Sequence, residues 1–145
     1  MPAAAPSAPV PTAHLDTFAR DRLPPPEALP EFLFELPALQ FPPRLNCATE
    51  LLDRRVREGQ GERPCVIGGD SMRWSYAELQ TRADRIARVL VDALGLVPGN
   101  RVLLRGPNSP MMAACWFAVV KAGGIAVGTM PLLRARELQV IVDKA

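Results

Sequence analysis

The sequence predicts an α/β fold with a parallel sheet that is incomplete within these 145 residues. Residues 101–105 and 125–127 are short apolar runs typical of strands, and all ten residues of 111–120 between them are apolar. Two strands joined by a helix of this length form a βαβ crossover, which pairs them in parallel through a right-handed connection. A parallel sheet needs cover on both faces. Because one chain of this length offers little to cover the far face, we expect part of the helix 111–120, at Trp116 and Phe117, to be bare.

The chain divides into two unlike parts. Residues 1–45 hold 11 of the 16 prolines and carry five acidic and three basic side chains. We expect 1–45 to be a proline-rich arm, disordered over 1–12 and otherwise extended across a folded body that begins at residue 46. Apolar residues between the prolines are suited to grooves on that body, and an arm that binds a partner is the alternative.

The body is expected to open with a helix over 47–57. Asn46 can cap its first turn, and glycines 59 and 61 end it. Its inward residues are predicted to be Leu51, Leu52 and Val56. Residues 64–67 and 72–74 are then expected to form two strands joined by a hairpin turn at 68–70.

The clearest local pattern belongs to the next helix. Ser75 is followed three residues later by Glu78, which is the spacing of a capping box, and Gly95 ends the run. A single apolar stripe follows the cap, at steps of one, three and four residues. Its members are Tyr76, Leu79, Ala83, Ile86, Ala87, Leu90, Val91 and Leu94.

The βαβ unit has its own start and stop residues. A turn at 97–100 leads into the strand 101–105, and Asn108 or Ser109 can cap the helix 110–122. The pair Gly123-Gly124 stops that helix before the strand that starts at 125. A last helix is expected from about Arg134, with Leu138, Ile141 and Val142 inward.

Composition excludes several classes of function. A scattered net charge of +2 gives no basic surface for nucleic acid. The longest apolar run is ten residues, too short to cross a membrane, and the N-terminus has no secretory pattern. Cys47, Cys65 and Cys115 are expected to be buried free thiols, which fits a cytoplasmic protein. The one histidine, His14, lies in the arm, so the sequence offers neither a metal site nor a base for a nucleophile.

Three glycine-containing turns are candidate anion sites. Gly68-Gly69 precedes Asp70, which would repel phosphate, and Gly123-Gly124 follows a helix rather than opening one. Lys121 is expected to complement that helix end, with anion binding as the lesser alternative. The turn 106–110 is the better candidate, because it follows a parallel strand and opens a helix. Capping alone also explains this turn. Residues 129–131 end a strand and can edge a pocket, but they offer no catalytic group, and no acid–base pair is found among Asp70, Glu78 and Asp84.

Five segments carry a resemblance to a known family. The chain from about 45 to 145 resembles the opening of the large domain of adenylate-forming acyl-CoA synthetases, most of all the 2-aminobenzoate– and benzoate–CoA ligases. Residues 16–26 of the arm are similar to the start of the aminobenzoate enzymes. The five segments are Trp74-Ser-Tyr-Ala-Glu-Leu, Pro98-Gly-Asn-Arg-Val, Asn108-Ser-Pro, Val120-Lys-Ala-Gly-Gly and Pro131-Leu-Leu-Arg-Ala-Arg-Glu-Leu.

The resemblance implies a two-step ligase active in aromatic compound degradation. A carboxylate attacks the α-phosphate of ATP-Mg²⁺ to give an acyl-adenylate and pyrophosphate, and the thiol of coenzyme A then displaces AMP. The family uses a Thr/Ser/Gly-rich loop ending in Pro-Lys, an acidic residue near the metal, a ribose-binding Asp and a C-terminal lysine. None of these segments occurs in residues 1–145, so no catalytic, cofactor-binding or metal-binding residue is assigned.

The chain alone is therefore expected to be inactive, to bind no ATP, Mg²⁺ or CoA, and to need the remainder of its own chain as partner. Two other interpretations stay open. One is a stand-alone α/β module that binds a small anion at 106–110, and the other is an interaction fragment that docks through 111–120.

Overall fold

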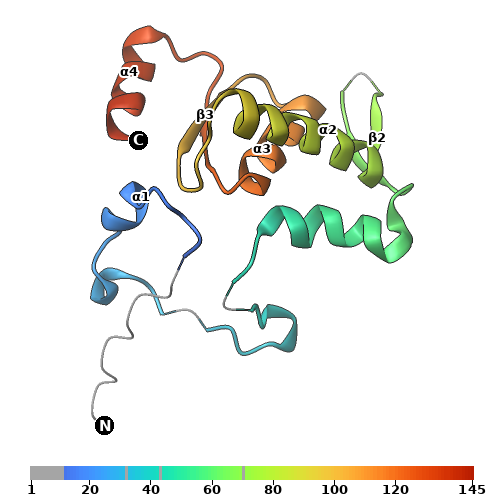
Figure 1. The fold of residues 1–145 in the computed structure, drawn as a ribbon, viewed down its shortest axis with the longest axis horizontal. Coiled ribbons are helices and arrows are strands. Elements are labelled where there is room, and N and C mark those ends of the chain that lie inside the picture. Colours follow the sequence, from blue (N-terminus) through green and yellow to red (C-terminus); the bar gives the residue numbers. More distant parts are fainter. Residues whose placement is uncertain (1–11, 32, 43, 70) are drawn as a thin grey trace.

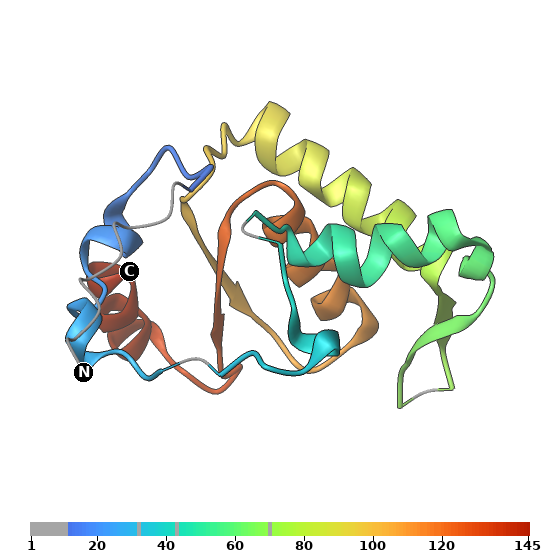
Figure 2. The same ribbon diagram turned by 90° about the horizontal axis from the view of Figure 1, so that it is seen from below.

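The centre of the computed structural model is a parallel βαβ unit, so the α/β prediction is confirmed. Strand β3 (Arg101–Arg105) pairs in parallel with β4 (Ile125–Thr129), and α3 (Pro110–Lys121) connects them. The register runs from Arg101 opposite Ile125 to Arg105 opposite Thr129. In Figure 2, α3 lies to one side of the two strands, between them and α2.

The structure describes residues 12–31, 33–42, 44–69 and 71–145. Except for Thr12, the segment predicted to be disordered lies outside these residues. Phe32 of the arm and Asp70 of the predicted hairpin turn lie outside them too.

The first helical run of the body covers residues 47–60 and contains two π-helical segments, η3 (Thr49–Asp53) and η4 (Val56–Gln60). The predicted cap is confirmed, because the Asn46 side-chain oxygen accepts hydrogen bonds from the Ala48 N–H at 3.0 Å and the Thr49 N–H at 3.4 Å. Leu52 is fully buried, but Leu51 is exposed. The prediction that Leu51 faces inward is wrong, because the described residues leave 57% of its surface exposed.

The hairpin and the capped helix form as predicted. Strands β1 (Pro64–Ile67) and β2 (Arg73–Ser75) pair antiparallel, and α2 (Tyr76–Arg88) continues as the π-helical η5 (Val89–Ala93). The capping box is complete: Ser75 Oγ accepts from the Glu78 N–H at 3.2 Å, and Glu78 Oε2 accepts from the Ser75 N–H at 2.9 Å.

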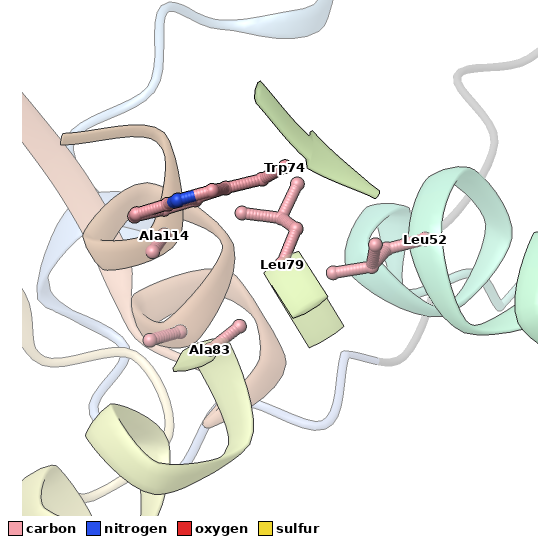
Figure 3. Packing of buried hydrophobic residues seen from close by; sticks show 6 residues of the cluster. Leu52, Trp74, Leu79, Ala83 and Ala114 are labelled. Atoms are coloured by element: carbon pink, nitrogen blue, oxygen red, sulfur yellow. The ribbon is translucent and has the colours of Figure 1, made fainter. Parts of the chain in front are cut away.

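The core lies where α2 packs against α3, with contributions from β2 and η3. Figure 3 shows the Trp74 ring lying over Ala114 of α3, with Leu79 beside it and Leu52 approaching from η3. Small side chains, Ala83 on α2 and Ala114 and Ala118 on α3, let the two helices approach closely. The predicted stripe is therefore buried at Leu79 and Ala83. The prediction that the stripe faces inward is wrong for Val91 and Leu94, which lie beyond α3 and are exposed.

Helix α3 packs against α2 and against both strands, and one part of its surface stays exposed. Ala114, Ala118 and Val119 are buried, whereas Met111 and Trp116 are exposed, Trp116 at 39% of its surface. The expectation of a bare Trp116 is confirmed; Phe117 is half-buried and packs edge-to-face on Trp116.

The C-terminal helix α4 (Ala135–Lys144) has no buried residue. It starts one residue after Arg134, as predicted, and Leu138 and Ile141 are half-buried. Val142 is 57% exposed, so its predicted inward position is wrong. Both views place α4 away from α3, at the same end of the molecule as α1 (Phe18–Asp21).

The arm follows an extended path with short helical turns. After α1 it contains two 3-10 turns, η1 (Pro26–Ala28) and η2 (Pro37–Leu39), each opened by a proline. Among the described residues of 12–45 none is buried. Figure 1 shows this segment in blue to cyan, running around the body rather than into it.

Candidate functional site

The two turns that the sequence places at the carboxyl ends of the parallel strands lie at one edge of the sheet. Arg105, the last residue of β3, donates from Nη2 to the carbonyl oxygens of Pro131 and Leu133, both at 2.8 Å. The Thr129 hydroxyl donates to the Leu104 carbonyl at 3.2 Å. These bonds tie the chain after β4 to the end of β3. The edge is where open α/β sheets bind ligands, and we call it the carboxyl edge.

Within the carboxyl edge, the turn 106–110 acts as a helix cap. Ser109 Oγ accepts from the Met112 N–H at 3.2 Å, and Pro110 occupies the first helical position, where its missing N–H costs nothing. Of the two predicted caps, Ser109 is thus the one used, and Asn108 lies exposed before it. Gly106 packs tightly, since a Cβ there would lie 2.9 Å from Met112 Cε.

In the other two glycine pairs, Gly68, Gly123 and Gly124 donate their N–H groups within the protein. Gly68 N–H donates to the Met72 carbonyl at 2.8 Å in the hairpin. After α3, Gly123 and Gly124 donate to the carbonyls of Val120 and Val119 at 3.0 and 2.8 Å, in a turn that Gly123 allows through its φ of 79°. These donors are consumed in ending the hairpin and the helix, so they form no cradle for a phosphate.

Lys121 joins three helical elements. Its ammonium lies 2.6 Å from an Asp53 carboxylate oxygen and also contacts Asp84. Burial alone would lower the pKa of Lys121, but the hydrogen bonds and charges of the two carboxylates outweigh burial and raise the pKa above its ordinary value. Lys121 lies in the last turn of α3, as the capping interpretation requires. Its main partners are nevertheless carboxylates on η3 and α2, which no local pattern could reveal.

A cavity of about 760 Å³ lies at the opposite, amino ends of β3 and β4. It is bounded by the arm, by Pro98 and by the end of α3. Three of its polar lining residues are His14, Arg44 and Cys47. The arm folds back so that His14 and Cys47, which are 33 positions apart in the sequence, both line this cavity.

The three cysteines are free thiols, as expected. Cys65 and Cys115 are half-buried, and burial raises the pKa of Cys65, with a smaller opposing hydrogen bond from Tyr76. Cys47 is exposed, so the prediction of burial is wrong there. It occupies the first turn after the Asn46 cap, beside the cavity.

Neither a metal cluster nor a membrane span is found in the part of the chain that the structure describes. No three side chains of His, Cys, Asp or Glu gather there as ligands. No helix among those residues combines the length and apolar character needed to cross a bilayer.

The comparison with protein families identifies the family to which this chain belongs. Residues 52–145, which include the core, the βαβ unit and the carboxyl edge, match the model of the AMP-binding enzymes. The chain belongs to the AMP-binding enzyme family.

Individual members of the AMP-binding family resemble the chain over most of its length. The salicyl-AMP ligase / salicyl-S-ArCP synthetase of Mycobacterium tuberculosis is 45% identical over 86 residues, 59% of this chain and 14% of that protein. The benzoate–CoA ligase of Thauera aromatica is 28% identical over 110 residues, 75% of this chain and 21% of that protein. The crystal structure of the anthranilate CoA ligase AuaEII with anthranoyl-AMP superposes with a TM-score of 0.60 at 25% identity, over 66% of this chain and 18% of that one.

The chain therefore spans about a fifth or less of the length of these AMP-binding relatives. Within that span, the five segments that carry the family resemblance have structural roles. They supply the buried Trp74 and the capping box, the turn before β3, the Ser109 cap, the Lys121 ion pairs and the start of α4. Among the described residues, Gly68, Gly123 and Gly124 donate their N–H groups within the protein, and no cluster of metal-ligating side chains is present.

Proposed function

We propose that this chain is the N-terminal part of an ATP-dependent ligase that activates an aromatic or other carboxylic acid as its acyl-adenylate and forms a CoA thioester. The match of residues 52–145 to the AMP-binding family carries this proposal. In it, residues 1–45 form an arm and 46–145 the start of the large AMP-binding domain. The carboxylate oxygen attacks the α-phosphorus of ATP, pyrophosphate leaves, and the thiol of CoA then displaces AMP.

The role of the described residues in this proposal is scaffolding. Arg105 and Thr129 hold together the two loops at the carboxyl edge, and Ser109 fixes the start of α3 beside them. The edge would form one wall of the active-site region. Residues beyond 145 would contact ATP, Mg²⁺ and CoA, and the 145-residue chain would be inactive alone.

An aromatic substrate is favoured by the printed names of the relatives: salicyl-AMP, benzoate and anthranoyl-AMP. Within that class we propose 2-aminobenzoate or benzoate, a role in aromatic compound degradation and a cytoplasmic location. The second candidate is a salicylate-activating ligase that passes the acyl group to an ArCP, as named for the M. tuberculosis relative at 45% identity. Neither candidate involves nucleic acid or a membrane.

The test is ATP–pyrophosphate exchange, measured on the product of the complete reading frame with benzoate, 2-aminobenzoate and salicylate. We expect exchange with at least one of them, followed by thioester formation on CoA. Residues 1–145 alone serve as the matched control and are expected to show no exchange above the no-enzyme background. Exchange by the control would refute the scaffolding role. Exchange with none of the three acids would refute the aromatic class.

A further inference from the structure

The N-terminal arm is attached to the body at one point by its own main chain. The N–H groups of Leu15 and Asp16 both donate to the carbonyl oxygen of Pro98, each at 2.9 Å. Pro98 belongs to the turn at 97–100, directly before β3. Two adjacent donors on one acceptor fix both the position and the direction of the arm where it crosses this turn.

The Asp16 side chain adds three further bonds at the same point. One carboxylate oxygen accepts from the Phe18 N–H at 3.0 Å, which folds the arm into the start of α1. The other accepts from Asn100 Nδ2 at 2.9 Å and pairs with Arg101. Asn100 and Arg101 are consecutive residues of the body, so the Asp16 carboxylate bonds to the side chains of both. Charge-assisted bonds of this kind are the stronger class of hydrogen bond.

Phe18 completes the contact through its ring. The Arg101 guanidinium carbon lies 4.2 Å from the ring centroid, within the range of a cation–π interaction. Arg22 of the arm lies over the same ring at 3.5 Å. Arg101 therefore contacts both side chains of an Asp-x-Phe motif, the carboxylate of Asp16 and the aromatic ring of Phe18.

Gly99 shows that the body is shaped for this contact. Its φ of 94° lies in the left-handed region, and a Cβ built there would lie 2.1 Å from the Asp16 carbonyl oxygen. No side chain fits at that distance, so the arm occupies the space that the missing Cβ leaves. Gly95 also has a positive φ, of 66°, but nothing lies within 4 Å of its Cβ position.

We propose that residues 98–101 form a peptide-recognition surface, specific for an Asp-x-Phe segment, that binds residues 14–18 of the same chain. We call residues 98–101 the seat. Binding is intramolecular and places Thr12, Ala13 and His14 as one wall of the 760 Å³ cavity. The arm is thus attached through a short recognition motif, and the stretch from 23 to 45 follows with no buried residue among those described.

The first test is amide hydrogen exchange on the full 145-residue chain. In the unmodified chain the N–H groups of Leu15 and Asp16 are expected to be protected. Gly99→Ala should raise their exchange rate by about tenfold or more, the loss of roughly one net hydrogen-bond contribution. Gly95→Ala is the matched control, because it meets the same left-handed backbone without the clash. Unchanged protection in Gly99→Ala, or equal loss in Gly95→Ala, would overturn the proposal.

A second measurement covers the case in which Gly99→Ala fails to fold. A synthetic peptide of residues 12–22 is added to the isotope-labelled Asp16→Ala chain, whose own arm is released. We expect chemical-shift changes at Gly99, Asn100 and Arg101, and none with a peptide carrying Phe18→Ala. Absence of shifts with the unmodified peptide contradicts the proposal. Protection of Leu15 that rises with protein concentration would assign the arm to a second copy and overturn the intramolecular claim.

Discussion

The body around α2 and α3 and the N-terminal arm are held by different kinds of contact. In the body, Leu52, Leu79 and Ala83 lose all exposure to water, and adjacent elements supply the burial. In the arm, large apolar side chains such as Leu33 and Phe34 stay exposed, and attachment depends on five polar and aromatic contacts at the seat. The body is therefore stabilised by burial distributed over many residues, whereas the arm depends on a few bonds that single substitutions can remove.

The largest effect is expected from the centre of the body. Leu79→Ala removes a fully buried side chain from the cluster around Trp74, and cavities of this kind cost about 2–5 kcal/mol. Thermal or urea unfolding followed by circular dichroism measures the loss. Leu94→Ala is the matched control, because its side chain is 71% exposed and its loss should cost about 0.5 kcal/mol or less. Equal effects of the two variants would show that no distinct core exists.

The next effect concerns the ion pairs that join α3 to the rest of the body. Lys121→Ala leaves Asp53, which is largely buried, without its cation, and we expect a cost of about 1–3 kcal/mol. Lys144→Ala is the control, since Lys144 lies exposed at the end of α4. If Lys121→Ala unfolds at the same denaturant concentration as the unmodified chain, the ion pairs do not stabilise the body.

A smaller effect tests whether the body also depends on local capping. Ser75→Ala removes the acceptor for the Glu78 N–H and should cost about 1 kcal/mol. Thr81→Ala, on the exposed face of the same helix, is the comparison and is expected to be close to neutral. The difference in unfolding free energy between the two variants measures the contribution of the cap; no difference would refute it.

The smallest effect on the body, and the most selective for the arm, is expected from acid. Hydrogen bonds from the Phe18 N–H and from Asn100, together with Arg101, hold the pKa of Asp16 below its ordinary value of 3.8. Because the pKa of Asp16 is depressed when the arm is bound, the ionised carboxylate stabilises the bound arm at pH values above the ordinary pKa. This stabilisation is lost as the pH falls through the lowered pKa. The amide shift of Gly99 should therefore move toward that of the released arm below about pH 4. Asp16→Asn should remove this dependence, and a Gly99 shift that still titrates in that variant would assign the effect to another group.

The sequence was sufficient where a local pattern and its packing coincide. The Ser75–Glu78 box, the Asn46 cap, the hairpin and the βαβ unit each follow from residues close together in the chain, and each is present. Periodicity failed at helix surfaces without a neighbour: Leu51, Leu94 and Val142 are on apolar stripes but exposed. A stripe indicates which face can be buried, and only the presence of a packing element decides whether it is.

The seat was beyond the reach of sequence reasoning for a different reason. Asp16 and Arg101 are separated by 85 positions, and neither belongs to a motif with an evident ligand. Lys121 and its carboxylates are similarly distant in the chain. The one local indication was Pro98-Gly-Asn, where a glycine in a turn indicates a left-handed backbone conformation. The close approach of the arm to this glycine depends on tertiary contacts, which the local sequence does not show.

Sequencing the coding frame past the codon for Ala145 tests the proposed ligase most directly. The proposal predicts an open frame that continues into a Thr/Ser/Gly-rich loop ending in Pro-Lys, the triphosphate-binding segment implied by the family resemblance. A stop codon immediately after Ala145, or a continuation without such a loop, would contradict the assignment of this chain to the N-terminal part of an ATP-dependent ligase.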